Sequence, residues 1–132
     1  VDEPYLGMPS REYLLRPFND SDVQAYYKYQ LGMAELLGAD RKTAERELKE
    51  AIEFEAEIAK ITVPLAERSN YTKLYNKMTL YELQMVAPEI PWYEYINTMI
   101  HPLFSIGTTE PIVVNNLDFF KKIGKLINET PK

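Results

Sequence analysis

Cysteine is absent from the 132 residues of this sequence, and histidine occurs once, at His101. Without cysteine the chain can form no internal disulfide and can perform no thiol chemistry. One histidine cannot supply the pair of imidazoles that a hydrolytic zinc helix uses, and it leaves a single candidate base for any serine triad. None of Ser10, Ser21, Ser69 and Ser105 lies in a Gly-x-Ser-x-Gly elbow. The sequence therefore offers no catalytic and no metal-binding residues.

Clustered glycine, excess basic charge and long apolar runs are also missing. The five glycines are scattered over positions 7, 32, 38, 107 and 124, so they form no phosphate-binding loop. Lys and Arg number 15 against 20 Asp and Glu, and this acidic balance disfavours binding to nucleic acid and to anionic membranes. No apolar stretch reaches the ~18 residues of a transmembrane helix. We expect no nucleic-acid partner and no membrane contact by this segment.

The residues that are present predict a mainly α fold. Apolar side chains recur at helical spacing over residues 21–37 and 41–60, and charged pairs four residues apart give the second helix a solvated face. Shorter elements follow. They are a helix begun by the Thr79–Glu82 capping box and ended by Pro88, a helix between Pro91 and Pro102, a short strand at 111–114, and a helix at 117–128 capped by Asn116. We expect a multi-helix lobe with at most one short strand near 111–114.

The opening stretch "YLGMPSREYLL" predicts a turn that feeds a short helix. Gly7 relaxes the backbone, Pro9 favours an extended residue before it, and the Ser10 hydroxyl can accept a free amide at the helix start. Arg11 and Tyr13 are expected to tie packed elements together rather than to contact a substrate.

Few ionisable residues suggest chemistry. His101 is expected at the surface or capping carbonyl groups at a helix end. Among three alternate glutamates only Glu53 and Glu57 share a helix face, which disfavours a paired acid–base site. Glu55 falls nearer the apolar stripe, so we expect it to be partly buried and matched to an arginine or to backbone amides.

Three Asn-x-Ser/Thr sequons are candidate N-glycosylation sites: Asn19, Asn70 and Asn128. They favour a secretory route. Asn70 lies in the polar stretch "ERSNYTK" and is the preferred acceptor, because Asn19 adjoins a helix cap and Asn128 is near a helix end.

Several ordered blocks resemble one protein family. The segment "LGMPSREYL" is similar to the "LGLPSRDYY" segment of the neprilysin and endothelin-converting-enzyme family of zinc metalloendopeptidases. Four further blocks follow in the family's order: "FEAEIAKITVP", "LYNKMTLYELQ", "APEIPWYEYINTMI" and "EPIVVNNLDFFKKIGKLIN". The resemblance covers nearly all 132 residues.

This resemblance implies that residues 1–132 are part of the amino-terminal helical lobe of a larger peptidase, which faces a catalytic lobe across an enclosed cavity. It implies zinc in the parent enzyme, held by a His-Glu-x-x-His motif that this chain lacks. It also implies an extracellular location, as a secreted protein or as the ectodomain of an anchored one. Partners would be the rest of the parent chain and, through it, peptide substrates. The lack of cysteine departs from several relatives.

An alternative is a stand-alone, secreted helical domain without catalytic activity that binds a protein partner through its tyrosine-rich faces. A further expectation concerns the helix between Pro91 and Pro102. Trp92, Tyr93 and Ile96 are predicted to form an exposed apolar surface that packs against missing sequence or a second copy.

Overall fold

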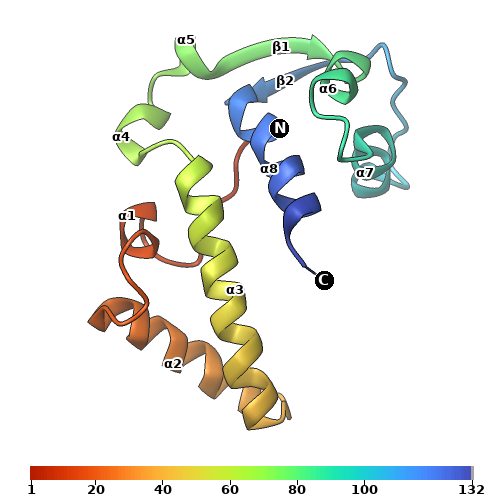
Figure 1. Ribbon diagram of the computed structural model, residues 1–132. Helices are drawn as coiled ribbons and strands as arrows, with labels where there is room; N and C mark the ends of the chain where they lie inside the picture. The colour runs from red at the N-terminus through yellow and green to blue at the C-terminus, as the bar shows by residue number, and fades with distance from the viewer. Residues whose placement is uncertain (132) are drawn as a thin grey trace. The chain divides into compact units, whose positions relative to one another are not determined.

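The computed structural model describes residues 1–131, with the backbone alone at position 71, and divides them into two compact units. One unit is the continuous segment Tyr5–Thr62. The other joins residues 1–4 to residues 63–131. Helices dominate both units, which confirms the mainly α fold (Figure 1).

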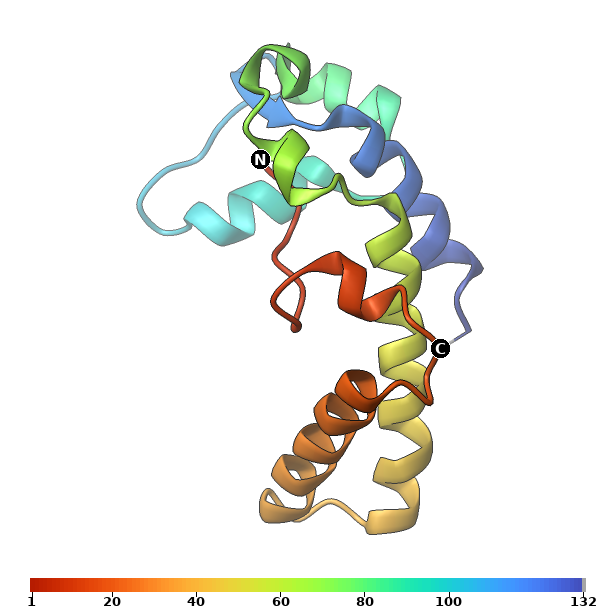
Figure 2. The ribbon, with the colours of Figure 1, turned by 90° about the vertical axis from the view of Figure 1, so that its left-hand side faces the viewer.

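The unit Tyr5–Thr62 is a helical hairpin with a short helix beside it (Figure 2). Helix α1 spans Arg11–Leu14, α2 spans Ser21–Leu36 and α3 spans Arg41–Ile61. The two long helices agree with the predicted ranges 21–37 and 41–60. Asp20 caps α2 by accepting from the amide of Asp22, and Asp40 caps α3 by accepting from the amide of Thr43. The buried apolar side chains are Leu14, Val23, Leu31, Ala44, Ile52 and Ala59.

The second unit combines short helices with a two-stranded sheet. Its elements are α4 (Leu65–Arg68), α5 (Tyr71–Leu74), β1 (Tyr75–Thr79), α6 (Leu80–Val86), α7 (Trp92–Ile100), β2 (Pro111–Asn115) and α8 (Leu117–Glu129). The strands are antiparallel, with Tyr75 opposite Asn115 and Thr79 opposite Pro111. The predicted capping box is confirmed, because Thr79 and Glu82 satisfy each other's backbone amides at the start of α6.

Strand β1 corrects the expectation of at most one strand. The predicted strand at 111–114 is present as β2, but it pairs with a second strand that the sequence analysis missed. The segment "YNKMT" has no β-branched run, and its strand conformation depends on hydrogen bonds to residues more than thirty positions away. Helices α4 and α5, of four residues each, were also not predicted.

Two predicted caps are wrong in their side-chain roles. Ser10 occupies the cap position of α1 without bonding a backbone amide, because its side chain bonds the carboxylate of Glu12 and lowers the pKa of that group. Asn116 precedes α8 with a left-handed φ of 52° and does not cap it. The Asn116 amide instead donates to Glu3.

Trp92 corrects the predicted exposed surface on α7. Its side chain is 2% exposed and packs edge-on against Phe120, with ring centroids 5.4 Å apart. The indole Nε1 donates to the carbonyl of Ala87 at 2.9 Å. Tyr93 is exposed and Ile96 is half-buried. Trp92 is therefore a core residue of its own unit, since both its ring and its N–H find partners there.

Candidate functional site

The opening turn is fixed by a carboxylate from α3. Glu55 accepts the backbone amide of Gly7 with one oxygen and the hydroxyl of Tyr26 with the other, the latter at 3.0 Å. Glu55 is half-buried. This confirms the prediction of a partly buried glutamate matched to a backbone amide, while its second partner is a tyrosine of α2 and not an arginine.

The environment of Tyr26 keeps its hydroxyl protonated. Burial, followed by the negative charge and hydrogen bond of Glu55, raises the pKa of Tyr26 to about 12. Tyr26 is thus a hydrogen-bond donor throughout the physiological range, and its pairing with Glu55 does not create a general base.

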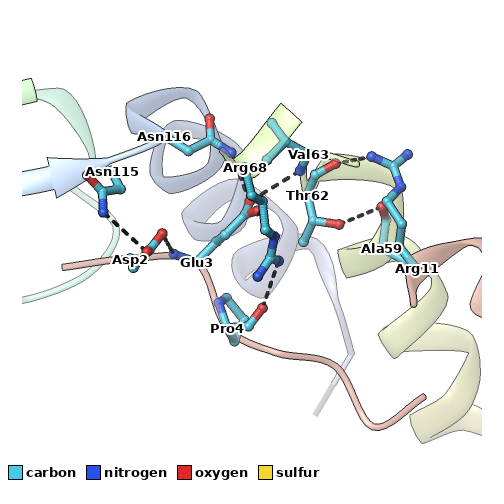
Figure 3. A network of polar contacts seen from close by, with 10 residues as sticks. All are labelled: Asp2, Glu3, Pro4, Arg11, Ala59, Thr62, Val63, Arg68, Asn115 and Asn116. Carbon is cyan, nitrogen blue, oxygen red and sulfur yellow. Dashed lines mark hydrogen bonds and ion pairs between the residues drawn. The ribbon is translucent and has the colours of Figure 1, made fainter. Parts of the chain in front are cut away.

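Position 7 requires glycine because the Tyr26 hydroxyl lies where a side chain would begin. A Cβ atom at this position would lie 1.9 Å from the Tyr26 hydroxyl oxygen, which no pair of non-bonded atoms tolerates. Four residues further along the chain, Arg11 donates from Nη1 to the carbonyl of Thr62 at the end of α3 (Figure 3). The guanidinium of Arg16 lies over the Tyr13 ring at 4.5 Å. The turn and α1 are therefore held within the unit by named contacts, in agreement with the expected structural role of Arg11.

The most buried ionic centre belongs to the other unit and is built around Glu3. This side chain is 2% exposed, and its Oε1 lies 2.9 Å from Nε of Arg68. Its Oε2 accepts from the Asn116 side chain at 2.8 Å and from the Val63 amide at 3.3 Å (Figure 3). Arg68 also donates to the carbonyl of Pro4. Glu3 thus ties residues 1–4 to α4 and to the start of α8.

Sequence reasoning missed the Glu3 centre. The partners Glu3 and Asn116 are 113 positions apart, and a single glutamate near a chain start has no periodic pattern. The only available signal was that Glu3 lies between Asp2 and Pro4, which does not identify a partner. Both carboxylate oxygens of Glu3 make contacts that stabilise the fold.

His101 lines an open hollow of about 680 Å³ with Tyr93, Glu94, Asn97 and Thr98. His101 is exposed, as expected for a surface residue at the end of α7. Asn97 exchanges two hydrogen bonds with the backbone of Ile106, so it holds the following loop in place. The lining contains one imidazole and one carboxylate, and no serine, which does not make a triad.

The paired glutamates of α3 are each engaged with a lysine. Glu53 and Glu57 line a second hollow of about 230 Å³, which confirms that they share a face. Lys49 lies 3.8 Å from Glu53, and Lys60 lies 2.5 Å from Glu57. Within residues 1–131, apart from the side chain at 71, no three His, Cys, Asp or Glu side chains are grouped so as to hold a metal ion. These residues do not fit a zinc centre.

The three sequon asparagines are all exposed. Asn70 precedes α5, and its Oδ1 accepts from the Lys73 amide at 3.2 Å. Asn19 lies just before the cap of α2, and Asn128 lies in the last turn of α8. Among the described residues no helix is both long enough and apolar enough to cross a bilayer.

The whole sequence, residues 1–132, matches the model of peptidase family M13. It is 40% identical to neprilysin-2 of Drosophila melanogaster over 132 residues, covering all of this chain and 17% of the relative. It is 36% identical to endothelin-converting enzyme 1 of Cavia porcellus over 134 aligned positions, covering 18% of that protein. The chain thus spans less than a fifth of the length of these relatives.

A solved structure has a similar fold. The zinc metalloprotease Zmp1 of Mycobacterium tuberculosis, in an open state determined by electron cryomicroscopy, superimposes with a TM-score of 0.76 at 16% sequence identity. The match covers 98% of this chain and 20% of the Zmp1 chain.

Proposed function

This chain belongs to peptidase family M13, and from that membership we propose that it is a non-catalytic helical section of a larger zinc endopeptidase that cleaves peptides. The observation that carries the proposal is the match along all 132 residues, joined to identities of 36–40% with two named peptidases. Any zinc of the parent would be held by residues outside this sequence, because the described side chains supply no ligand group.

We propose further that this section is part of the amino-terminal lobe and walls the substrate cavity. A wall needs rigid elements, and the two internal anchors at Glu55 and Glu3 are suited to that role. An enclosed chamber would admit peptides and exclude folded proteins, and it would shield the reaction on the opposite lobe from bulk water. Selection by size is the contribution expected of this segment.

The parent peptidase tests this role through substrates of different size. We expect the wild-type parent to cleave short peptides and to spare folded proteins. Loosening the wall by Glu3→Gln is expected to raise cleavage of a large, unstructured substrate while short-peptide cleavage stays within about twofold. Equal loss of both activities would instead assign the segment a role in folding alone. Glu129→Gln, the same chemical change at an exposed position of the same unit, is the matched control.

Location and glycosylation follow from the same proposal. The parent is expected outside the cell, as a secreted enzyme or as the ectodomain of an anchored one. Asn70 is the preferred glycan acceptor because it is exposed within the polar stretch that joins α4 to α5. Glycopeptide mapping that finds Asn70 bare and Asn19 or Asn128 occupied would overturn this ranking.

The length of the natural polypeptide separates this proposal from the stand-alone binding domain. Mass spectrometry of the native product is expected to detect a chain several times longer than these 132 residues. A natural product of about this length would favour the interaction domain instead.

A further inference from the structure

Helix α2 carries an apolar stripe that its own unit leaves open. Ala25, Tyr29, Gly32 and Leu36 follow the spacing i, i+4, i+7, i+11, which aligns them along one side of the helix. Tyr29 is 66% exposed and Leu36 is 83% exposed, and Met33 beside them is 43% exposed. The side of α2 that packs in the hairpin is a different one, marked by the buried Val23 and Leu31.

The neighbouring helix shows what a solvated face of this hairpin looks like. Exposed ion pairs four residues apart run along α3, linking Arg41 to Glu45, Arg46 to Glu50 and Lys49 to Glu53. Ala25, Tyr29, Gly32 and Leu36 are all uncharged, and charged residues border them, with Lys28 and Glu35 on one side and Asp22 in the first turn on the other. Two helices of one hairpin therefore present opposite kinds of surface.

Gly32 is a second, independent sign of a missing neighbour. Glycine in the middle of a helix is less stable than alanine, and a Cβ at position 32 would meet nothing within 4 Å. Nothing in the hairpin therefore requires a glycine there. A glycine flanked along the helix by Tyr29 and Leu36 forms a shallow notch, which allows the backbone of another helix to approach closely.

We propose that the stripe of Ala25, Tyr29, Gly32 and Leu36, together with Met33 beside it, is the docking surface for an apolar helix from the remainder of the parent peptidase. This inference rests on the proposed function. The occupant is assigned to the same polypeptide because the chain spans only 17–18% of the length of its relatives, so most of such a parent lies outside these residues. A covalently continuous helix would bind at a high effective concentration and needs no separate recognition element.

Hydroxyl-radical footprinting of the intact parent tests the proposal, because tyrosine and methionine are readily oxidised. If the stripe is covered, Tyr29 and Met33 are expected to react at least ~tenfold more slowly in the native parent than in the unfolded one. Rates within about threefold of the unfolded values, as their exposure in this structure implies, would overturn the inference while leaving the proposed function intact. Protection that grows with protein concentration would assign the stripe to a second copy and overturn it too.

Substitution of Gly32 in the same parent distinguishes a covered helix from an uncovered one by whether the melting temperature rises or falls. On an uncovered helix Gly32→Ala raises the melting temperature, because alanine is the better helix former. Under a closely packed helix both Gly32→Ala and Gly32→Leu are expected to lower it, with the larger side chain having the larger effect. Lys42→Leu on the solvated side of α3 is the control and is expected to leave the melting temperature unchanged. A rise with both glycine substitutions would contradict the docking surface. Absence of any longer parent polypeptide would instead refute the proposed function.

Discussion

The two units of this chain differ in how their stabilising contacts are distributed along the sequence. The hairpin unit is continuous, and its helices, caps and ion pairs join residues that are near one another in the chain. The other unit is discontinuous, because Val1 and Glu3 are bonded to Val113 and Asn116, more than a hundred positions away. Local patterns therefore specify the two long helices of the first unit, while the second unit depends more heavily on long-range polar and aromatic contacts.

The largest expected effect comes from removing the aromatic centre of the discontinuous unit. Trp92→Ala deletes a 2% exposed side chain together with its ring contact and its bond to Ala87, and should cost about 3–5 kcal/mol of unfolding free energy. Denaturant titration measures this loss. Tyr93→Ala, at an exposed neighbouring position, is the control, and a cost equal to that of Trp92→Ala would contradict the assignment of Trp92 to the core.

Removal of the buried carboxylate of Glu3 should destabilise the discontinuous unit and leave the hairpin unit unchanged. Glu3→Ala removes the acceptor of the Asn116 amide and the buried end of the ion pair with Arg68, at a cost of about 3 kcal/mol. Hydrogen exchange should accelerate in β1, β2 and α8 but not in α2 and α3. Faster hydrogen exchange in both units alike would show that they unfold together, which would contradict their separate stabilisation.

A smaller loss of unfolding free energy is expected when a methyl group is added at Gly7, which lies against the Tyr26 hydroxyl. Gly7→Ala should cost about 1–3 kcal/mol, since the new methyl group collides with the Tyr26 hydroxyl. The double variant Gly7→Ala, Tyr26→Phe removes the colliding oxygen and should recover part of that loss. Strict additivity of the two single changes in calorimetry would argue against the contact.

The smallest expected effect, and the one with a pH signature, is Tyr26→Phe. The pKa of Tyr26 is raised to about 12 in the folded state from an ordinary value of 10.0, so the stabilisation by its hydroxyl is complete below pH 10 and is lost as the pH rises toward 12. The difference in unfolding free energy between wild type and Tyr26→Phe should shrink over that range. A constant difference would contradict the Glu55–Tyr26 bond.

The sequence predicted the features that depend on nearby residues and missed those that depend on distant ones. The ranges of α2 and α3 and the Thr79–Glu82 capping box were predicted, because each is encoded within a few turns of helix. Strand β1 and the role of Asn116 were not, because each is determined by a partner distant in sequence. Trp92 was misplaced because an amphipathic spacing shows that a face is apolar but not what covers it.

The candidate site shows the same limit. Glu55 could be predicted to be partly buried from its place near the apolar stripe of α3, and its backbone-amide partner was among the expected alternatives. The hydrogen bond between Glu55 and Tyr26 could not be predicted, because this pairing depends on how α2 crosses α3. The family resemblance supplied what residue patterns could not, namely the kind of larger protein to which such a helical section belongs.

We propose that this M13 section works only as part of a longer peptidase. The most direct measurement compares hydrolysis of a short peptide by the native full-length product and by the 132-residue chain, each with and without a zinc chelator. We expect chelator-sensitive cleavage by the full-length product and none by the 132-residue chain. Cleavage by the short chain, or a full-length product that is inactive with zinc present, would contradict it.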